Sequence, residues 1–359
     1  MNLFENMLGG DESLFLESMA LDVDYTPPVI KHREGEQGHI ASCLKPLFSK
    51  RSGKNLIITG VPGIGKTLAT KHLLEELKDQ TNDIKTIFIN CWKKDTPFKI
   101  IAEMCQQLGF KFIAGRNTDE LTKEVIKILN KGACVIVLDE ADKIEDQHIF
   151  YSILEEIFTK CLICITNDGD WLSKLDQRVR SRMLAEIVQF KAYNYEEIKS
   201  ILQERVNYAF VPGVFDTDAF NLIVDKCSEI GDVRSGLFLL KNAGEEAESK
   251  SKRKITIEEA KIAIEKLVEF QRKSTSQLGE EEELILNLVK NNSGKTSSKM
   301  HEIYAVNGGK LAYTTFQRKL KSLEKGKFVT LNKVNVGKGM TTSVNYGGPD
   351  NEKTLGDYI

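Results

Sequence analysis

The stretch NLIITGVPGIGKTLATKHLL, residues 55–74, decides the fold of this 359-residue chain. A short apolar run typical of a buried strand leads into the loop GVPGIGKT, and an amphipathic pattern typical of a helix follows. The loop matches G-x-x-x-x-G-K-[ST] in full, and its glycines let backbone N–H groups turn inward around phosphates. The stretch therefore predicts a strand, a phosphate-binding loop (P-loop), a helix and a bound nucleotide.

Within this loop, we expect Lys66 to bring positive charge to the β- and γ-phosphates. The hydroxyl of Thr67 is expected to ligate Mg²⁺, so the predicted cofactors are ATP or ADP with Mg²⁺. The positions expected to contact the nucleotide here are Gly60, Pro62, Gly63, Ile64, Gly65, Lys66, Thr67 and Leu68.

Two acidic residues follow a second apolar strand in CVIVLDEAD, residues 134–142. Asp139 suits Mg²⁺, directly or through water, and Glu140 is placed to orient and deprotonate an attacking water. Acids after a strand can also be helix caps. Two consecutive acids after an apolar run, 73 residues beyond Lys66, favour the catalytic interpretation.

A third polar residue, Asn167, ends the next strand in ICITND, residues 163–168. Its amide could hydrogen-bond both the γ-phosphate and the lytic water. Asn-Asp after a strand also fits an ordinary turn, so the prediction depends on its place after the two other motifs.

The pattern of apolar residues divides the chain into regions. Short apolar runs alternate with amphipathic stretches over residues 55–190, which predicts a parallel sheet covered on both faces. After residue 194 only the helical period remains, and the last region shows three short helices followed by a hairpin, the outline of a winged helix. The predicted division is an acidic tail (1–24), an α/β ATPase base domain (25–193), a helical domain (194–274), a winged helix (278–346) and a second tail (347–359).

Charge is distributed unevenly along the chain. The net charge is −2, but residues 284–346 hold ten lysines and one arginine against two glutamates, a net charge of +9 that leaves −11 for the rest. Such asymmetry is typical of a protein that binds a phosphate backbone, although a solvated lysine-rich surface would look the same. We therefore expect duplex DNA as a partner.

The third helix of the basic region separates into two faces. Phe316, Leu320 and Leu323 recur at helical spacing and are predicted to pack inward. A basic face opposite them is what a major-groove reader needs, although a winged helix can also bind protein. The expected DNA contacts are Thr315, Arg318, Lys321, Ser322 and Lys325 on the helix and Lys338 in the turn between the two strands.

The cellular setting is inferred from what the sequence lacks. No apolar run approaches the roughly 20 residues of a membrane helix, and residues 1–30 hold no Lys or Arg, unlike a secretory signal. Of the seven cysteines, Cys161 and Cys164 form a C-x-x-C that we interpret as core thiols of a strand. We expect a reducing, cytoplasmic setting without a membrane partner, and the expected binding to DNA adds association with the nucleoid.

Taken in order, these motifs resemble those of an AAA+ ATPase. DQRVRSR at residues 176–182 resembles the segment that supplies an arginine finger to a neighbouring subunit, which implies Arg178 or Arg182. GDVRSGLFLL at residues 231–240 resembles the second sensor, in which Arg234 reaches from a helical lid to the γ-phosphate. For each arginine, a surface salt bridge is the alternative.

Further segments resemble the archaeal origin-recognition and cell-division-cycle-six type of replication initiators. They are PPVIKHREGE (27–36), INCWKKDTPFKIIAEMCQQLG (89–109) and AYNYEEIKSILQERVNYAF (192–210). The resemblance implies that Tyr193 and Arg205 line the nucleotide and that Val29 and Ile30 pack near the adenine. Ala192 departs from the family, which often has proline there.

The resemblance also implies a function. It implies an ATP-dependent initiator that binds origin DNA, helps recruit or load the replicative helicase, works beside paralogous initiator subunits and hydrolyses ATP slowly as a switch. A second DNA contact between Lys93 and Arg116 is implied as well. The alternatives are a P-loop signalling or transcription regulator with a winged helix, and a clamp-loader or transposition-type AAA+ ATPase that acts as a ring.

Overall fold

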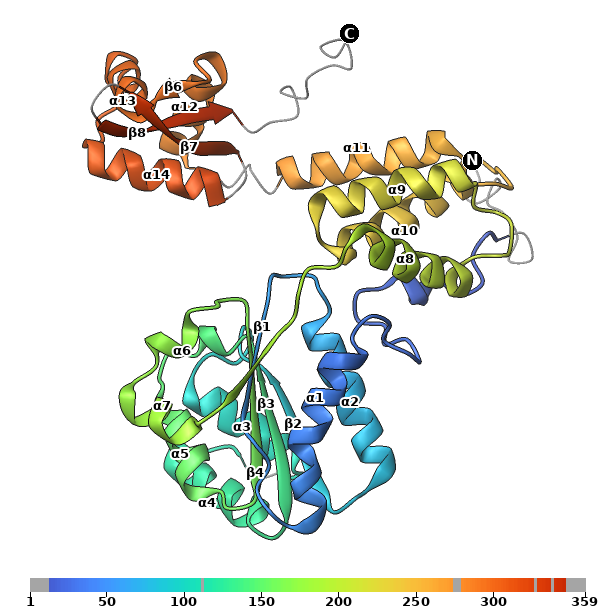
Figure 1. Ribbon diagram of the computed structural model, residues 1–359, viewed down its shortest axis with the longest axis vertical. Helices are drawn as coiled ribbons and strands as arrows, with labels where there is room; N and C mark the ends of the chain where they lie inside the picture. The colour runs from blue at the N-terminus through green and yellow to red at the C-terminus, as the bar shows by residue number, and fades with distance from the viewer. Residues whose placement is uncertain (1–12, 111–112, 274–278, 326–327, 337–338, 347–359) are drawn as a thin grey trace. The chain divides into compact units, whose positions relative to one another are not determined.

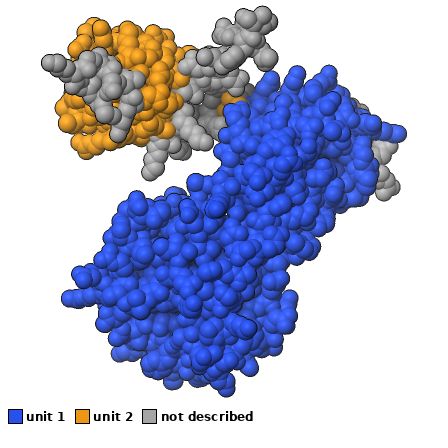
Figure 2. All heavy atoms as spheres, in the orientation of Figure 1, with its two compact units in different colours: residues 1–267 blue, residues 268–359 orange. Residues whose placement is uncertain are grey.

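The computed structural model describes residues 13–110, 113–273, 279–325, 328–336 and 339–346. The chain divides into two compact units, residues 1–267 and residues 268–359, coloured separately in Figure 2. The first unit holds an α/β base and a helical lid, and each unit is described by itself.

A five-stranded parallel sheet forms the centre of the base (Figure 1). Its strands are β1 (Leu56–Thr59), β2 (Ile84–Asn90), β3 (Ala133–Asp139), β4 (Lys160–Thr166) and β5 (Glu186–Gln189), in the spatial order β2-β3-β4-β1-β5. The helices of the base are α1 (Glu34–Leu44), α2 (Lys66–Gln80), α3 (Pro97–Gln107), α4 (Thr118–Leu129), α5 (His148–Glu156), α6 (Trp171–Lys174) and α7 (Gln177–Met183). The predicted parallel α/β domain is confirmed.

Helices cover both faces of this sheet because successive strand residues point to opposite sides. Ile57 of β1 and Ile136 of β3 belong to the core that α3, α4, α5 and α7 cover. Leu56 and Val135, their immediate neighbours in the chain, belong to the core beneath α1 and α2. The strands β1, β3 and β4 are therefore apolar between their ends, whereas β2 carries Lys85 and Thr86 within the strand.

The lid consists of four helices. They are α8 (Tyr195–Ala209), α9 (Thr217–Ile230), α10 (Val233–Ser249) and α11 (Ile257–Lys273). Helix α8 begins at a capping box in which Asn194 accepts from the Glu197 N–H and the Glu197 carboxylate accepts from the Asn194 N–H. The predicted helical domain after residue 194 is present.

The segment expected to be an acidic tail is packed against the lid from residue 13 onward. Leu14, Ala20 and Leu21 are buried in the lid core, and residues 18–21 form a 3₁₀ turn, η2 (Ser18–Leu21). The Leu16 N–H donates to the Ala209 carbonyl at 2.8 Å. The tail prediction is therefore wrong for residues 13–24, because apolar side chains among the acids supply enough buried surface to fix the segment.

The second unit has the element order expected of a winged helix. Its elements are α12 (Glu280–Asn291), β6 (Lys295–Thr296), α13 (Ser297–Val306), α14 (Tyr313–Lys325), β7 (Val329–Val336) and β8 (Gly339–Tyr346). The three strands pair antiparallel in the order β6-β8-β7. Phe316, Leu320 and Leu323 are buried in a core of this unit, as their helical spacing predicted.

Two further expectations concern the chain as a whole. Cys161 and Cys164 are buried in β4 with free thiols, in agreement with their interpretation as core residues. Among the helices that the structure describes, none has the length and apolar character needed to cross a membrane.

Candidate nucleotide-binding site

The P-loop joins the end of β1 to the start of α2. Gly63 and Gly65 have φ angles of 77° and 86°, a backbone region that favours glycine, and Gly65 is the residue at which α2 is capped. The loop therefore leads directly into the N-terminus of α2, where the backbone N–H groups of the first turn and the helix dipole attract anions.

The ammonium group of Lys66 lies inside this loop. It donates to the carbonyls of Gly60 and Val61, both at 2.8 Å, and to the Asn167 side-chain oxygen at 2.7 Å. Burial lowers the pKa of Lys66 to about 8. The structure thus brings together the predicted lysine and the predicted strand-end amide, although 101 residues separate them in sequence.

The predicted metal ligands also lie together. The Thr67 hydroxyl donates to Asp139 Oδ2 at 2.9 Å, and burial raises the pKa of Asp139 while this hydrogen bond opposes the change. A hydroxyl oxygen beside a carboxylate is the kind of oxygen ligand that Mg²⁺ takes together with phosphate oxygens and water. The two residues therefore fit a magnesium ion.

Glu140 has an uncommon conformation for its position. Its φ of 54° places a non-glycine residue in the left-handed region, and its Oε2 is buried with no hydrogen-bond partner among the described residues. A buried, unpartnered carboxylate oxygen is costly unless water or a ligand satisfies it. This geometry fits an acceptor for a water molecule in the cavity.

The lid meets the P-loop through the start of α10. Asp232 caps α10 by accepting from the Arg234 N–H, and its carboxylate also holds the Arg234 guanidinium with distances of 2.7 to 3.1 Å. A Cβ added to Gly63 would lie 2.1 Å from Asp232 Oδ1. Only glycine fits at position 63 while the lid is in this place.

A cavity of about 610 Å³ collects these groups within the first unit. Base and lid both line it. The predicted residues on its wall are Pro62, Gly63, Ile64, Gly65, Lys66, Thr67, Leu68, Asp139, Glu140, Asn167, Tyr193, Arg205 and Arg234. Unpredicted wall residues include Val23, Asp24, Thr26, Asn90, Lys71, Ile201, Val233 and Leu237.

Five residues predicted for this site are not on the cavity wall, and one of them, Gly60, lies in the P-loop itself, where its carbonyl accepts from Lys66. Val29 is 55% exposed, Ile30 is buried in the core beneath α1 and α2, and neither is on the cavity wall. Arg178 and Arg182 are on α7, also away from the cavity, and Arg182 donates to the Glu155 carboxylate at 2.5 Å. A finger that acts on a neighbouring subunit would have to lie outside its own cavity, so that role stays a prediction.

Sequence reasoning missed the most connected residue beside the loop, Arg33. Its buried guanidinium donates to the Ile64 carbonyl at 3.1 and 3.3 Å, to the Lys191 carbonyl at 2.7 Å and to the Tyr193 hydroxyl at 3.0 Å. It also lies 3.9 Å from the centre of the Tyr193 ring. The segment PPVIKHREGE contains Arg33 and its ion-pair partner Glu36, but the partners beside the loop are 31 to 160 residues away and leave no local signal.

The predicted DNA contacts are placed in part. Arg318, Lys321 and Ser322 are exposed on α14 and Thr315 is half-buried, whereas Lys325 is the last residue of that helix. Lys338 lies outside the described residues.

The basic segment after β2 carries ion pairs of its own. Lys94 pairs with Glu103 at 3.2 Å and Lys99 with Asp95 at 2.7 Å, while Lys93 and Lys94 reach the cavity wall. The second DNA contact that we expected between Lys93 and Arg116 stays a prediction.

Comparisons with known proteins find relatives of both the base and the lid. A family model described as an AAA domain matches residues 50–167, and one described as a Cdc6 AAA+ ATPase-type lid domain matches residues 199–265. The chain is 31% identical over 330 residues to an ORC1-type DNA replication protein of Desulfurococcus amylolyticus, which covers 86% of this chain and 81% of that protein. It is 35% identical over 263 residues to ORC1-type DNA replication protein 1 of Sulfurisphaera tokodaii, covering 68% of this chain and 65% of that protein.

Solved structures are similar over almost the full length. The Aeropyrum pernix ORC1 protein in complex with DNA aligns with a TM-score of 0.74 and 24% identity, covering 94% of each chain. The Aeropyrum pernix ORC2 protein in ADPNP-ADP complexes aligns with a TM-score of 0.70 and 19% identity, covering 93% of this chain and 94% of that one. At these identities the likeness shows a shared fold.

Proposed function

This chain belongs to the ORC1-type DNA replication protein family, and we propose that it is an ATP-dependent initiator that binds duplex DNA at replication origins. Family membership confirms the resemblance on which the prediction was based. The observation that carries the ATP-dependent part is the single cavity that holds the P-loop, the Asp-Glu pair, a strand-end amide and a lid arginine.

The positions of the cavity residues support a different role for each of them in ATP hydrolysis. Lys66 would exchange its contacts with the Gly60 and Val61 carbonyls for phosphate oxygens, while Thr67 and Asp139 would hold Mg²⁺. Magnesium supplies charge neutralisation of the phosphates when it is bound. Glu140 has a free buried oxygen with which to orient a water and accept its proton.

Arg234, on lid helix α10, is the residue through which the position of the lid would depend on the bound nucleotide. Its guanidinium is now held by Asp232, two residues away, and hydrogen bonding to Asp232 raises the pKa of Arg234. A γ-phosphate would compete with this carboxylate for the same donors, so the lid would be held differently with ATP and with ADP. We propose that slow hydrolysis acts as a switch of this kind rather than as a source of work.

The second unit supports the DNA-binding part of the proposal. Its residues 284–346 carry a net charge of +9, and α14 exposes Arg318 and Lys321 on the face opposite its buried residues. Arginine on such a helix can grip guanine, and lysine the backbone. Recruitment or loading of the replicative helicase, and work beside paralogous initiators, are proposed from family membership.

The proposal is tested by mapping where the protein sits on the chromosome. We expect a few sites at replication starts, and we expect their loss in an Arg318→Ala/Lys321→Ala variant. The matched control is Lys78→Ala/Lys127→Ala, which removes the same charge from exposed positions of the base. Binding sites confined to promoters would indicate a transcription regulator. Unchanged binding sites in the Arg318→Ala/Lys321→Ala variant would mean that another part of the chain recognises DNA.

The ring alternative has a separate test. A switch of this kind does not require a closed ring, whereas a clamp-loader or transposition-type ATPase does. We expect light scattering with ATP and without DNA to show no stable ring, and a closed oligomer under these conditions would contradict the proposal.

A further inference from the structure

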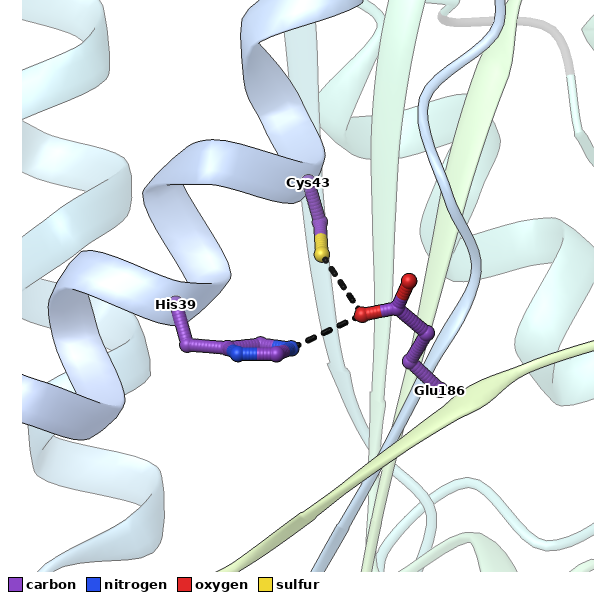
Figure 3. Close-up of side chains that lie close together, drawn as sticks. All are labelled: His39, Cys43 and Glu186. Atoms are coloured by element: carbon purple, nitrogen blue, oxygen red, sulfur yellow. Dashed lines mark hydrogen bonds and ion pairs between the residues drawn. The ribbon is translucent and has the colours of Figure 1, made fainter.

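Three side chains of different ligand chemistry converge where α1 meets the edge strand β5 (Figure 3). His39 and Cys43 come from α1 and Glu186 is the first residue of β5. Glu186 Oε2 lies 2.8 Å from His39 Nε2 and 3.6 Å from Cys43 Sγ, and each residue offers a ligand atom within 4.8 Å of the other two. This site is separate from the nucleotide cavity, whose wall contains none of the three.

We propose that His39, Cys43 and Glu186 bind one transition-metal ion of the zinc class. Bonds of about 2.0 to 2.3 Å to N, O and S at tetrahedral angles put ligand atoms about 3.3 to 3.8 Å apart. The Glu186–Cys43 distance of 3.6 Å is within that range, the Glu186–His39 distance of 2.8 Å is shorter, and the His39 and Cys43 atoms lie within 4.8 Å of each other, so side-chain rotations would complete the site. His39 and Cys43 can both contribute because residues four apart share one face of a helix.

The mixture of ligands selects the kind of metal. One imidazole nitrogen, one sulfur and one carboxylate oxygen are ligands for Zn²⁺ or Co²⁺, whereas Mg²⁺ and Ca²⁺ need sets of oxygens. The site provides three protein ligands, and the His39 side chain is 47% exposed. Water therefore has access to the fourth position, as in zinc sites with three protein ligands.

A fourth residue fixes the carboxylate. Lys54 Nζ donates to Glu186 Oε1 at 2.6 Å, which turns the other oxygen, Oε2, toward His39 and Cys43. Hydrogen bonding of a ligating carboxylate through its second oxygen orients it for a metal. The positive charge of Lys54 also repels a cation, so Lys54 limits the affinity while it sets the geometry.

Binding has a simple proton balance. Cys43 binds as the thiolate, so its S–H bond breaks and one proton goes to solvent when the metal–sulfur bond forms. His39 binds through the lone pair of Nε2, so the Nε2 proton that faces Glu186 in the metal-free structure goes to solvent, and the neutral ring carries its one proton on Nδ1. No electrons are transferred.

The bound ion would tie α1 to β5. Arg33 comes immediately before α1, Tyr193 follows β5 by four residues, and these two residues contact one another beside the P-loop. A metal at His39, Cys43 and Glu186 would therefore restrict the motion of α1 and β5, the two elements next to Arg33 and Tyr193. We expect it to stabilise the chain against heat, because a ligand that binds only the folded state does so.

The test uses Co²⁺ as a spectroscopic substitute for zinc. The full-length chain is freed of metal with a chelator under reducing conditions and titrated with Co²⁺ in the presence of saturating Mg²⁺ and ADP, which occupy the nucleotide cavity. We expect one Co²⁺ per chain, a thiolate-to-cobalt charge-transfer band, visible bands of tetrahedral cobalt, and displacement by one equivalent of Zn²⁺.

The variants assign the ligands. Cys43→Ser removes the charge-transfer band, and His39→Ala and Glu186→Gln, at more exposed positions, raise the Co²⁺ dissociation constant about tenfold or more. Lys54→Gln retains the band and tightens binding. Cys227→Ser, a buried thiol of the lid, leaves spectrum and affinity unchanged. Absence of the band in the parent chain, or parent-like cobalt binding by His39→Ala and Glu186→Gln, would overturn the proposal.

Discussion

At the scale of single residues, Lys66 shows how this chain prepares a place for phosphate. Its ammonium group is buried and makes three hydrogen bonds, two of them to carbonyls of its own loop. Burial disfavours its charge, which is why its pKa falls to about 8. Phosphate oxygens would restore the stability of the charged form, so nucleotide binding and protonation of Lys66 are coupled.

This coupling predicts how nucleotide affinity depends on pH. Bound phosphates raise the pKa of Lys66, so above about pH 8 the free protein must take up a proton in order to bind. We expect the Mg²⁺-ATP dissociation constant to rise as pH increases through 8, by up to about tenfold per pH unit. Calorimetry between about pH 7 and 9.5 measures this, and Lys66→Ala should lack the rise. If the dissociation constant of the parent chain changed as little with pH as that of Lys66→Ala, the coupling would be contradicted.

Glu140 carries a second prediction at this scale. Its unpartnered buried oxygen has no structural task that the described residues reveal, so Glu140→Gln should leave Mg²⁺-ATP binding nearly unchanged. Loss of the general base should slow hydrolysis about 10²- to 10⁴-fold. Single-turnover phosphate release measures the rate, and Glu145→Gln at an exposed position nearby is the control. Hydrolysis at the parent rate in Glu140→Gln would assign the base elsewhere.

Single residues also show where the sequence was sufficient. The P-loop is contiguous, and the Asp139-Glu140 pair and Asn167 end strands, so strand periodicity placed them at one edge of the sheet. The packing of Arg33 and Asp232 against the P-loop was missed because it depends on contacts with Ile64, Tyr193 and Gly63, far away in sequence. His39, Cys43 and Glu186 were missed for the same reason.

At the scale of elements, the N-terminal segment shows how a short stretch becomes part of a distant domain. Residues 13–25 have neither helical nor strand period, so their attachment could not be predicted from pattern. Arg205 of α8 donates to the Ala20 carbonyl at 3.1 Å and the Tyr25 carbonyl at 3.4 Å, and Lys241 of α10 pairs with Asp22 at 2.8 Å. The segment thus packs against the lid core, and its residues 23 and 24, together with Thr26 just after it, lie on the cavity wall.

This attachment predicts a stability difference between two neighbouring residues. Leu21 is 2% exposed in the lid core, and Met19 in the same 3₁₀ turn is 65% exposed. Leu21→Ala should lower the free energy of unfolding by about 2 to 5 kcal/mol, because it removes buried surface and leaves a cavity. Met19→Ala should change it by less than about 0.5 kcal/mol. Chemical denaturation measures both, and equal effects would mean that the segment is not part of the folded lid.

At the scale of the whole molecule, charge separates the two ends of the chain. The basic region carries +9 while the rest carries −11, and this division was visible in the sequence because it requires only counting. How the charges are presented required the structure, since Arg318 and Lys321 are exposed on α14 whereas Lys319 pairs with Glu282 at 3.0 Å.

The charge separation predicts a steep dependence of DNA binding on salt. Each phosphate contact contributes about −0.9 to the slope of log affinity against log salt concentration. We expect the Arg318→Ala/Lys321→Ala variant of the full chain to have a slope shallower by about 2. Fluorescence anisotropy with duplex DNA measures it, beside the Lys78→Ala/Lys127→Ala control. If parent and variant had the same slope of log affinity against log salt concentration, these side chains would not contact phosphate.

The claim on which the account depends is that one cavity, built by base and lid together, binds Mg²⁺-ATP through Lys66. Titration calorimetry of the full chain with Mg²⁺-ATP tests it directly, comparing the parent with Lys66→Ala and with Lys78→Ala, an exposed lysine of the same helix. The account predicts that Lys66→Ala weakens binding at least about thirtyfold, as expected for loss of a buried charge partner, while Lys78→Ala binds like the parent. Parent-like affinity in Lys66→Ala would contradict it.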